Sequence, residues 1–206
     1  MKENNSIVAQ TEAYVKDLLS HDLPCDIFYH TLPHTQEVVR AVKVIGQREG
    51  VSPQEQEILI VSAWFHDVGF VKAYHKHEEA SIAMASAFLG DKHYHERSLE
   101  QVVAGIGATK IPQKPTSLLE MILCDADLYH LSQPDYWEKN RLLRKELEQC
   151  FGTYHQDEPW FRQNLNFLQA HHYFTHYGRT VLEIGKQKHQ EENEEIVEEL
   201  AQDIRK

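Results

Sequence analysis

The sequence predicts an all-α fold. Apolar residues recur at three- and four-residue spacing along nearly every patterned segment, as they do at Val38, Ala41 and Ile45. This spacing places them on one face of a helix. No segment shows the alternation of a half-buried strand, and no Asn-Gly or Asp-Gly pair marks a hairpin. Glycines and prolines lie between the segments that have this helical spacing. Together these observations favour a bundle of helices.

The stripes place the helices in order along the chain. The stripe at 38–45 closes at Gly46 or Gly50, because glycine commonly ends a helix. Pro53 opens the next helix at a position that proline favours, and we expect that helix to run to Gly69. Further helices are predicted at 77–90, 99–106, 118–128 and 161–172.

Two other segments have a distinct character. The segment 109–115 carries two prolines, which predict a loop. The tail from Gln187 onward is mostly charged, but it keeps apolar residues at helical spacing, namely Ile196, Val197, Leu200 and Ile204. We interpret this tail as a solvated terminal helix. The alternative is a helix that binds a partner or connects to another part of the protein.

Length and charge limit the classes of function. The chain has 206 residues, enough for one sizeable domain and a small appendage. Its net charge of −11 argues against general binding to nucleic acid, which requires a basic surface. A small phosphorylated ligand is compatible with this charge, because a bound metal ion can supply local positive charge.

The cysteines and the N-terminus indicate a cytoplasmic protein. Cys25, Cys124 and Cys150 are odd in number and form no C-x-x-C pair, which is typical of reduced thiols. No apolar signal segment follows the first residues. No uninterrupted apolar stretch approaches the length of about 20 residues that spans a bilayer. We therefore expect no membrane segment in this chain.

The doublet His66-Asp67 is the most informative feature of the sequence. It follows the apolar run 58–61 and the pair Trp64-Phe65, so the segment is predicted to be buried. Burying an ionisable group is tolerated when the group is paired or binds a metal ion. The doublet is therefore a candidate metal site.

Asp125 and His34 extend this candidate site. Asp125 stands four residues after Met121 and three before Leu128, so its carboxylate is predicted to face the core, where a lone Asp needs a partner. Alternatively, Asp125 is a capping or hydrogen-bonded structural residue. His34 begins a helix whose next turns are apolar, and alone it would more often be structural or exposed.

Taken together, His34, His66, Asp67 and Asp125 supply two imidazoles and two carboxylates. Mixed nitrogen and oxygen ligands of this kind suit a divalent transition ion such as Mn, Fe, Co, Ni or Zn. With fewer than six protein ligands, positions stay open for water and substrate. The hypothesis is a divalent metal centre, with Mg as a further candidate ion.

On an all-α chain, this order of residues resembles the HD superfamily of metal-dependent phosphohydrolases. His34 matches the first ligand of the family, His66 and Asp67 match its signature doublet, and Asp125 matches its last ligand. The resemblance covers about residues 8–150. It implies an HD-domain helical bundle at 1–150, followed by a C-terminal helical extension at 151–206.

Two phrases are similar to a bacterial subgroup of these proteins. They are 75–81, His-Lys-His-Glu-Glu-Ala-Ser, and 108–112, Ala-Thr-Lys-Ile-Pro. Some longer relatives in that subgroup carry a membrane module linked to cyclic-nucleotide signalling, which this chain does not show. Enzymes with two metal ions supply further histidines after the doublet. This chain offers His75 and His77 but has Thr109-Lys110 at the later position, which favours one ion.

The resemblance implies a small phosphorylated substrate, such as a nucleotide. A metal ion would lower the pKa of a bound water for attack on phosphorus, with Asp67 binding the ion and orienting or deprotonating that water. Lys110 could bind a phosphate oxygen, or it is simply an exposed lysine. His30 or His77 could protonate the leaving oxygen. His30 precedes His34 by four residues, as in the Y-H-N-x-x-H motif of cyclic-nucleotide phosphodiesterases, although Thr31 replaces the Asn.

Glu78 begins a helix, where negative charge is favourable in any case. It is also a candidate for orienting a histidine or a water in the site.

Three functions remain open from the sequence. The first is a metal-dependent phosphohydrolase, acting as a phosphomonoesterase or a phosphodiesterase. The second is a non-catalytic sensor that binds metal and nucleotide and signals through its C-terminal helix. The third is a scaffold with a structural metal ion. A homodimer is compatible with each, and we expect no nucleic acid partner.

Overall fold

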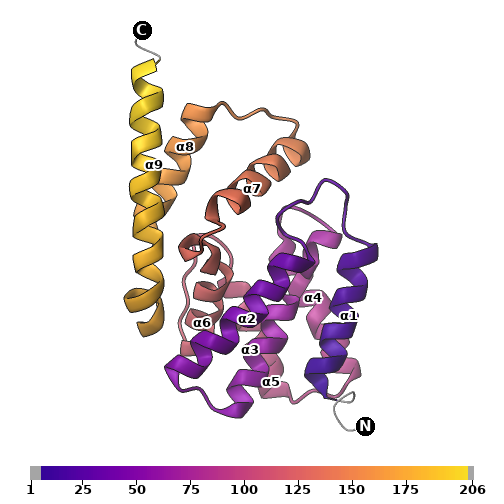
Figure 1. Cartoon of the computed structure of the whole chain (residues 1–206). Coiled ribbons are helices and arrows are strands. Elements are labelled where there is room, and N and C mark those ends of the chain that lie inside the picture. The colour runs from indigo at the N-terminus through magenta and orange to yellow at the C-terminus, as the bar shows by residue number, and fades with distance from the viewer. Residues whose placement is uncertain (1–5, 204–206) are drawn as a thin grey trace.

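The computed structural model describes residues 6–203, so the prediction for Ile204 lies outside the described part. That part consists of helices joined by loops and contains no strand, which confirms the all-α fold. A bundle comprises α1 (Ile7–His21), α2 (Leu32–Glu49), α3 (Pro53–Phe65), α4 (His77–Asp91), α5 (Glu96–Ala108) and α6 (Leu118–Asp127). The chain continues through α7 (Tyr136–Phe151), α8 (Asp157–Ala170) and α9 (Glu183–Asp203). Figure 1 shows α8 and α9 side by side outside the six-helix bundle.

Helix α3 is the centre of the bundle. It packs against α1, α2, α4, α5 and α6, and its side chains from Ile58 to Phe65 are mostly buried. Its start is defined by a capping box, in which Ser52 and Glu55 bond each other's backbone N–H groups, with Pro53 in the first turn. The end of this buried helix is where the His66-Asp67 doublet lies.

The expectation that this helix runs to Gly69 is wrong. The α-helix ends at Phe65, and the 3₁₀ turn η2 (Val68–Val71) follows. Asp67 leaves the helical conformation, with φ −111° and ψ 3°. Gly69 then comes so close to α4 that a Cβ on it would lie 2.0 Å from the His77 carbonyl oxygen. The absent side chain lets η2 lie on the first turn of α4, which brings His77 near Asp67.

Most other expected elements are confirmed. Gly50, with φ 74°, ends α2, and the segment 109–115 contains no helix. Helix α8 begins at Asp157, two residues before Pro159, and ends before His172. Two helices that the analysis of spacing did not identify are α1 and α7. The inward face of α7 includes the polar side chains Asn140 and Glu146, so apolar spacing does not reveal it.

The C-terminal helix is partly buried, through a stripe that is mostly polar. Lys186, His189, Asn193 and Val197 are each at most 7% exposed. The ammonium of Lys186 donates to the His171 carbonyl oxygen, and Nδ1 of His189 donates to the Leu131 carbonyl oxygen. Helix α9 therefore packs on the rest of the chain by hydrogen bonding, and it is not fully solvated. No helix within residues 6–203 combines the length and apolarity that crossing a membrane requires.

Candidate metal centre

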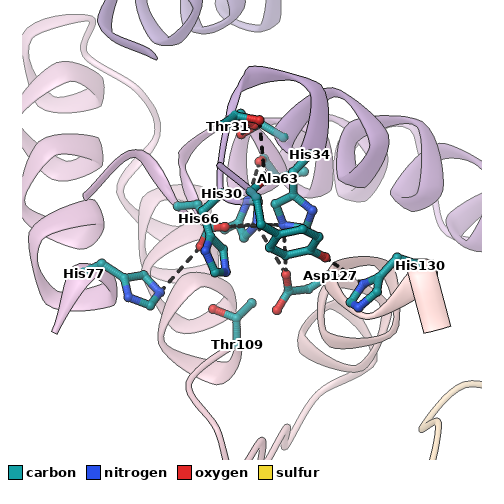
Figure 2. Close-up of polar contacts among 12 residues, drawn as sticks. His30, Thr31, His34, Ala63, His66, His77, Thr109, Asp127 and His130 are labelled. Atoms are coloured by element: carbon teal, nitrogen blue, oxygen red, sulfur yellow. Dashed lines mark hydrogen bonds and ion pairs between the residues drawn. The ribbon is translucent and has the colours of Figure 1, made fainter. Parts of the chain in front are cut away.

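Three helix ends bring four potential ligands together. His34 lies in the first turn of α2, His66 and Asp67 follow the last residue of α3, and Asp127 is the last residue of α6. One ligand atom from each residue can be chosen so that all four atoms lie within 4.8 Å of one another. Figure 2 shows the side chains of His34, His66 and Asp127 pointing toward one another.

The contacts within this cluster are close and buried. The Nε2 atoms of His34 and His66 are 3.3 Å apart. Oδ2 of Asp67 lies 3.4 Å from Nε2 of His34 and 3.1 Å from Nε2 of His66. Oδ1 of Asp127 lies 3.4 and 3.5 Å from the same two nitrogens. The side chain of Asp127 is the most exposed of the four, at 16%. Solvent therefore reaches the cluster mainly beside Asp127.

The donor set fits a divalent cation. Nδ1 of His66 lies 2.8 Å from the Ala63 carbonyl oxygen and donates to it, which leaves the Nε2 lone pair for the cluster. Oδ2 of Asp67 is buried and accepts no hydrogen bond of normal geometry from the described residues. Two imidazole nitrogens and two carboxylate oxygens that face one point are ligands for a transition ion.

The charges of the cluster stabilise one another. Burial alone would raise the pKa of Asp67, but the neighbouring imidazoles of His66 and His34 hold it well below its usual value. Burial alone would lower the pKa of His66, but Asp67 and Asp127 raise it well above its usual value. The cluster thus keeps its carboxylates in the negative form that binds cations, and a bound ion would displace the protons that these carboxylates favour on the imidazoles.

Residues 31–132 match the family model of the HD domain. The chain belongs to the HD domain family. Members of this family are generally metal-dependent hydrolases, and the match spans all four residues of the cluster. No match to the chain is found among curated proteins.

The placement of Asp125 in the ligand set is corrected by the structure. Asp125 is fully buried, but its carboxylate turns away from the group of His34, His66, Asp67 and Asp127, here called the HD cluster. Oδ1 accepts from the Phe174 N–H, and Oδ2 accepts from the N–H and the hydroxyl of Thr175. Asp127 occupies that position in the cluster instead. Asp125 is a hydrogen-bonded structural residue, which is the alternative interpretation from the sequence.

The reason for this error lies in the burial of α6. Its residues from Ile122 to Ala126 are all buried, so the helix has core on nearly every side. A residue on the same face of α6 as Met121 and Leu128 is therefore buried against other parts of the protein, but it does not necessarily face the HD cluster. Asp127 could have been proposed from the same Asp-Ala-Asp segment, two residues later.

Substituting Asp125 with alanine is expected to reduce stability. The change leaves the part-buried N–H of Phe174 and the buried N–H of Thr175 without their acceptor, and it removes the bonds that join this segment to Asp125 of α6. We expect the free energy of unfolding to fall by roughly 2–4 kcal/mol. Urea denaturation followed by circular dichroism measures it. A loss below about 0.5 kcal/mol, the usual range for surface changes, would contradict this role.

His77 and Glu78 lie beside the cluster. Nε2 of His77 is 3.5 Å from Oδ1 of Asp67, while its Nδ1 is 3.1 Å from the Tyr74 carbonyl oxygen. Glu78 is nearly buried, with Oε1 3.7 Å from Nε2 of His77. His75 is exposed and packs on Phe151. Of these histidines, His77 is therefore the one that lies against the cluster.

His30 is held at the edge of the site by Glu146 of α7. Nδ1 of His30 lies 2.5 Å from Oε1 of Glu146. Oε2 of Glu146 accepts from the backbone N–H groups of Phe28, Tyr29 and His30. This carboxylate is 0% exposed. Burial would raise its pKa, but the hydrogen bonds from His30 and the backbone lower it below the usual value. Glu146 therefore fixes both the backbone of the loop at 28–30 and the orientation of the His30 ring.

Two further residues complete the surroundings. His130, buried, has Nδ1 2.8 Å from the Tyr29 hydroxyl, and burial together with nearby His34 lowers its pKa to about 3, so it is neutral. Lys110 is exposed, with Nζ 3.9 Å from Oε1 of Glu79. Neither Glu146 nor His130 is predicted from the sequence, because neither stands in a motif or on an apolar stripe.

A cavity of about 690 Å³ opens beside the cluster. Its lining includes every residue proposed from the sequence for catalysis, namely His30, Asp67, His77, Glu78 and Lys110, and also Asp127. The structure therefore brings the proposed catalytic residues to one cavity.

Proposed function

We propose that this HD domain is a metal-dependent phosphohydrolase that cleaves a phosphate ester of a nucleotide or another small phosphorylated molecule. The observation that carries the proposal is the buried cluster of His34, His66, Asp67 and Asp127 at the side of an open cavity. A structural metal site has a closed set of ligands, whereas this cluster adjoins a space large enough for a substrate.

The four clustered residues would hold the metal ion. When bound, a divalent ion supplies Lewis acidity toward water and phosphoryl oxygen. Asp67 presents Oδ2 to His34 and His66 and Oδ1 to His77. One oxygen of this carboxylate can bind the ion, while the other orients the attacking water and accepts its proton.

Three other residues act on the substrate in this proposal. Lys110 supplies a positive charge for a phosphate oxygen at the rim of the cavity. His30 is held through Nδ1 by Glu146, and His77 is held through Nδ1 by the Tyr74 carbonyl. Each could transfer a proton from Nε2 to the leaving oxygen, and Nε2 of His77 lies 3.5 Å from Oδ1 of Asp67 and 3.7 Å from Oε1 of Glu78. Glu78 orients His77.

The test is hydrolysis by protein that is stripped of metal and reloaded with Mn, Fe, Co, Ni, Mg or Zn. The substrates are nucleotides, cyclic nucleotides and generic phosphate esters. Asp67→Ala is measured in parallel, with Asp17→Ala as a matched control, because the Asp17 side chain is 78% exposed and lies on α1. We expect turnover that requires the ion, that Asp67→Ala abolishes and that Asp17→Ala leaves unchanged.

Absence of turnover from folded, metal-loaded protein across the whole set would reject the phosphohydrolase. Binding of a nucleotide under those conditions would instead support the alternative of a non-catalytic sensor.

A further inference from the structure

The cavity beside the HD cluster is larger than a phosphate group requires. Its volume of about 690 Å³ lies within the range of about 300–1,000 Å³ that is typical of pockets for whole small molecules. The catalytic candidates account for one part of its lining. The remainder is therefore available to the organic group of a substrate.

Part of that remainder comes from outside the region that matches the family. Helices α7 and α8 lie after residue 132, where the HD match ends, and Figure 1 shows them outside the bundle of α1–α6. Their residues in the cavity form what we call the α7–α8 wall: Leu143, Leu147, Trp160, Gln163, Asn164 and Phe167.

The wall is uncharged and mainly apolar. It contributes two leucines, a phenylalanine and a tryptophan, and none of its six residues is acidic or basic. Phe167 is half-buried, so part of its ring is covered and part is accessible. An apolar surface of this kind binds the apolar body of a ligand through burial of area.

The polar atoms of this wall are mostly bonded to other protein groups. Nε1 of Trp160 donates to Oδ1 of Asn140 at 2.9 Å. Oδ1 of Asn164 accepts from Nδ2 of Asn140 at 2.7 Å, and its Nδ2 donates to the Trp160 carbonyl oxygen at 2.9 Å. A ligand rich in hydroxyl groups would therefore leave many of them without partners against this wall, which is costly.

The opposite character is found at the α4 and α5 side of the same cavity. Lys76 and Lys110 line it and lie 4.0 and 3.9 Å from the two oxygens of Glu79. Both lysines are more than half exposed, so their charges can also reach an anion. The cavity thus combines a charged part, suited to phosphate, with an apolar aromatic part.

We propose that the α7–α8 wall binds the organic group of the substrate and that this group contains a flat aromatic ring, packed against Phe167 and the two leucines. The proposal rests on the proposed hydrolysis of phosphate esters. An aryl group and a nucleobase share this chemistry. A sugar or a glycerol group does not.

The test compares esters that differ in the organic group alone. The substrates are 1-naphthyl phosphate for an aryl ring, adenosine 5′-phosphate for a base, and glycerol 2-phosphate without a ring. The variant is Phe167→Ala. The matched control is Phe161→Ala, because Phe161 is a half-buried ring on the same helix that packs near Trp137 and does not line the cavity.

We expect Phe167→Ala to lower kcat/KM for the ring substrates by about 5- to 150-fold, the range for loss of one stacked ring, mainly through KM. Glycerol 2-phosphate should be unaffected, and Phe161→Ala should leave all three unchanged. The naphthyl and adenosine arms distinguish an aryl site from a base site. An equal effect on esters with and without a ring would overturn the proposal.

Binding separates this proposal from the proposed hydrolysis. Phenylphosphonate and methylphosphonate resist hydrolysis, and calorimetry measures their affinities for wild type, Phe167→Ala and Leu143→Ala. The second variant serves if the first unfolds. We expect both variants to weaken phenylphosphonate alone. Such a result without turnover would support binding of the ring by the α7–α8 wall and would reject the proposed hydrolysis. Turnover together with equal affinity for the two phosphonates would reject binding of the ring by this wall.

Discussion

Replacing Asp127 with alanine is expected to abolish both tight metal binding and phosphate ester hydrolysis. Asp127 places Oδ1 within 3.5 Å of Nε2 of His34 and His66, and it completes the ligand cluster. Loss of a residue that merely supports a ligand costs about 10–100-fold in affinity or activity. Loss of a ligand should therefore weaken metal affinity by more than about 100-fold. Competition with a chelating indicator measures the affinity.

Asp125→Asn is the control for this experiment. Both aspartates lie in the last turns of α6, but the Asp125 carboxylate bonds Phe174 and Thr175. Asparagine keeps one acceptor oxygen, so we expect a moderate loss of stability and metal affinity that changes by less than about tenfold. Normal affinity in Asp127→Ala together with loss in Asp125→Asn would show that the roles of the two aspartates are reversed.

Replacing Glu146 is expected to affect stability and catalysis together. Glu146→Ala removes the acceptor of three backbone N–H groups and of the His30 ring. Leaving a buried hydrogen-bond donor without its acceptor costs about 1–3 kcal/mol, and Glu146→Ala leaves several donors unpaired. Glu146→Gln keeps the shape and one acceptor oxygen, so it should destabilise the fold less than Glu146→Ala. It should still lower kcat, because the His30 ring loses the carboxylate oxygen that orients it. Urea denaturation and steady-state kinetics measure these effects.

The pH dependence gives Glu146 an independent test. Its pKa in the folded protein lies below the reference value of 4.5. Its stabilising effect is therefore fully present above that value and is lost as pH falls through the lowered pKa. The difference in stability between wild type and Glu146→Gln should thus be largest near neutral pH and shrink in acid. A difference that stays constant down to strongly acidic pH would contradict an ionised Glu146.

Five of the six helices of the bundle, α2 to α6, were predictable because their buried faces are largely apolar. The stripe from Val38 to Ile45 and the punctuation by Gly50 and Pro53 locate α2 and the start of α3 correctly. The same reasoning cannot find α7, because Asn140 and Glu146 face inward there. Apolar spacing also predicts, wrongly, that α9 is solvated. The buried stripe of this helix contains the polar residues Lys186, His189 and Asn193, which would ordinarily be expected on a solvent-exposed face. Polar side chains that bond distant partners leave no periodic signal.

Most of the candidate site was predictable from local context. A histidine and an aspartate after the apolar end of a helix have few explanations other than a pair or a metal site, and the structure clusters His34, His66 and Asp67. The choice between Asp125 and Asp127 depends on which neighbour faces each side of a buried helix. Glu146 is 116 residues from His30 in the chain. Contacts over such a separation follow from the tertiary fold and not from any spacing in the sequence.

The most direct test of the metal centre is anomalous X-ray diffraction from crystals of the protein loaded with one transition ion. Data are recorded above and below the absorption edge of that ion. We expect an anomalous peak among Nε2 of His34, Nε2 of His66 and the carboxylates of Asp67 and Asp127. A peak coordinated by Asp125, or no peak at this cluster in fully loaded protein, would contradict it.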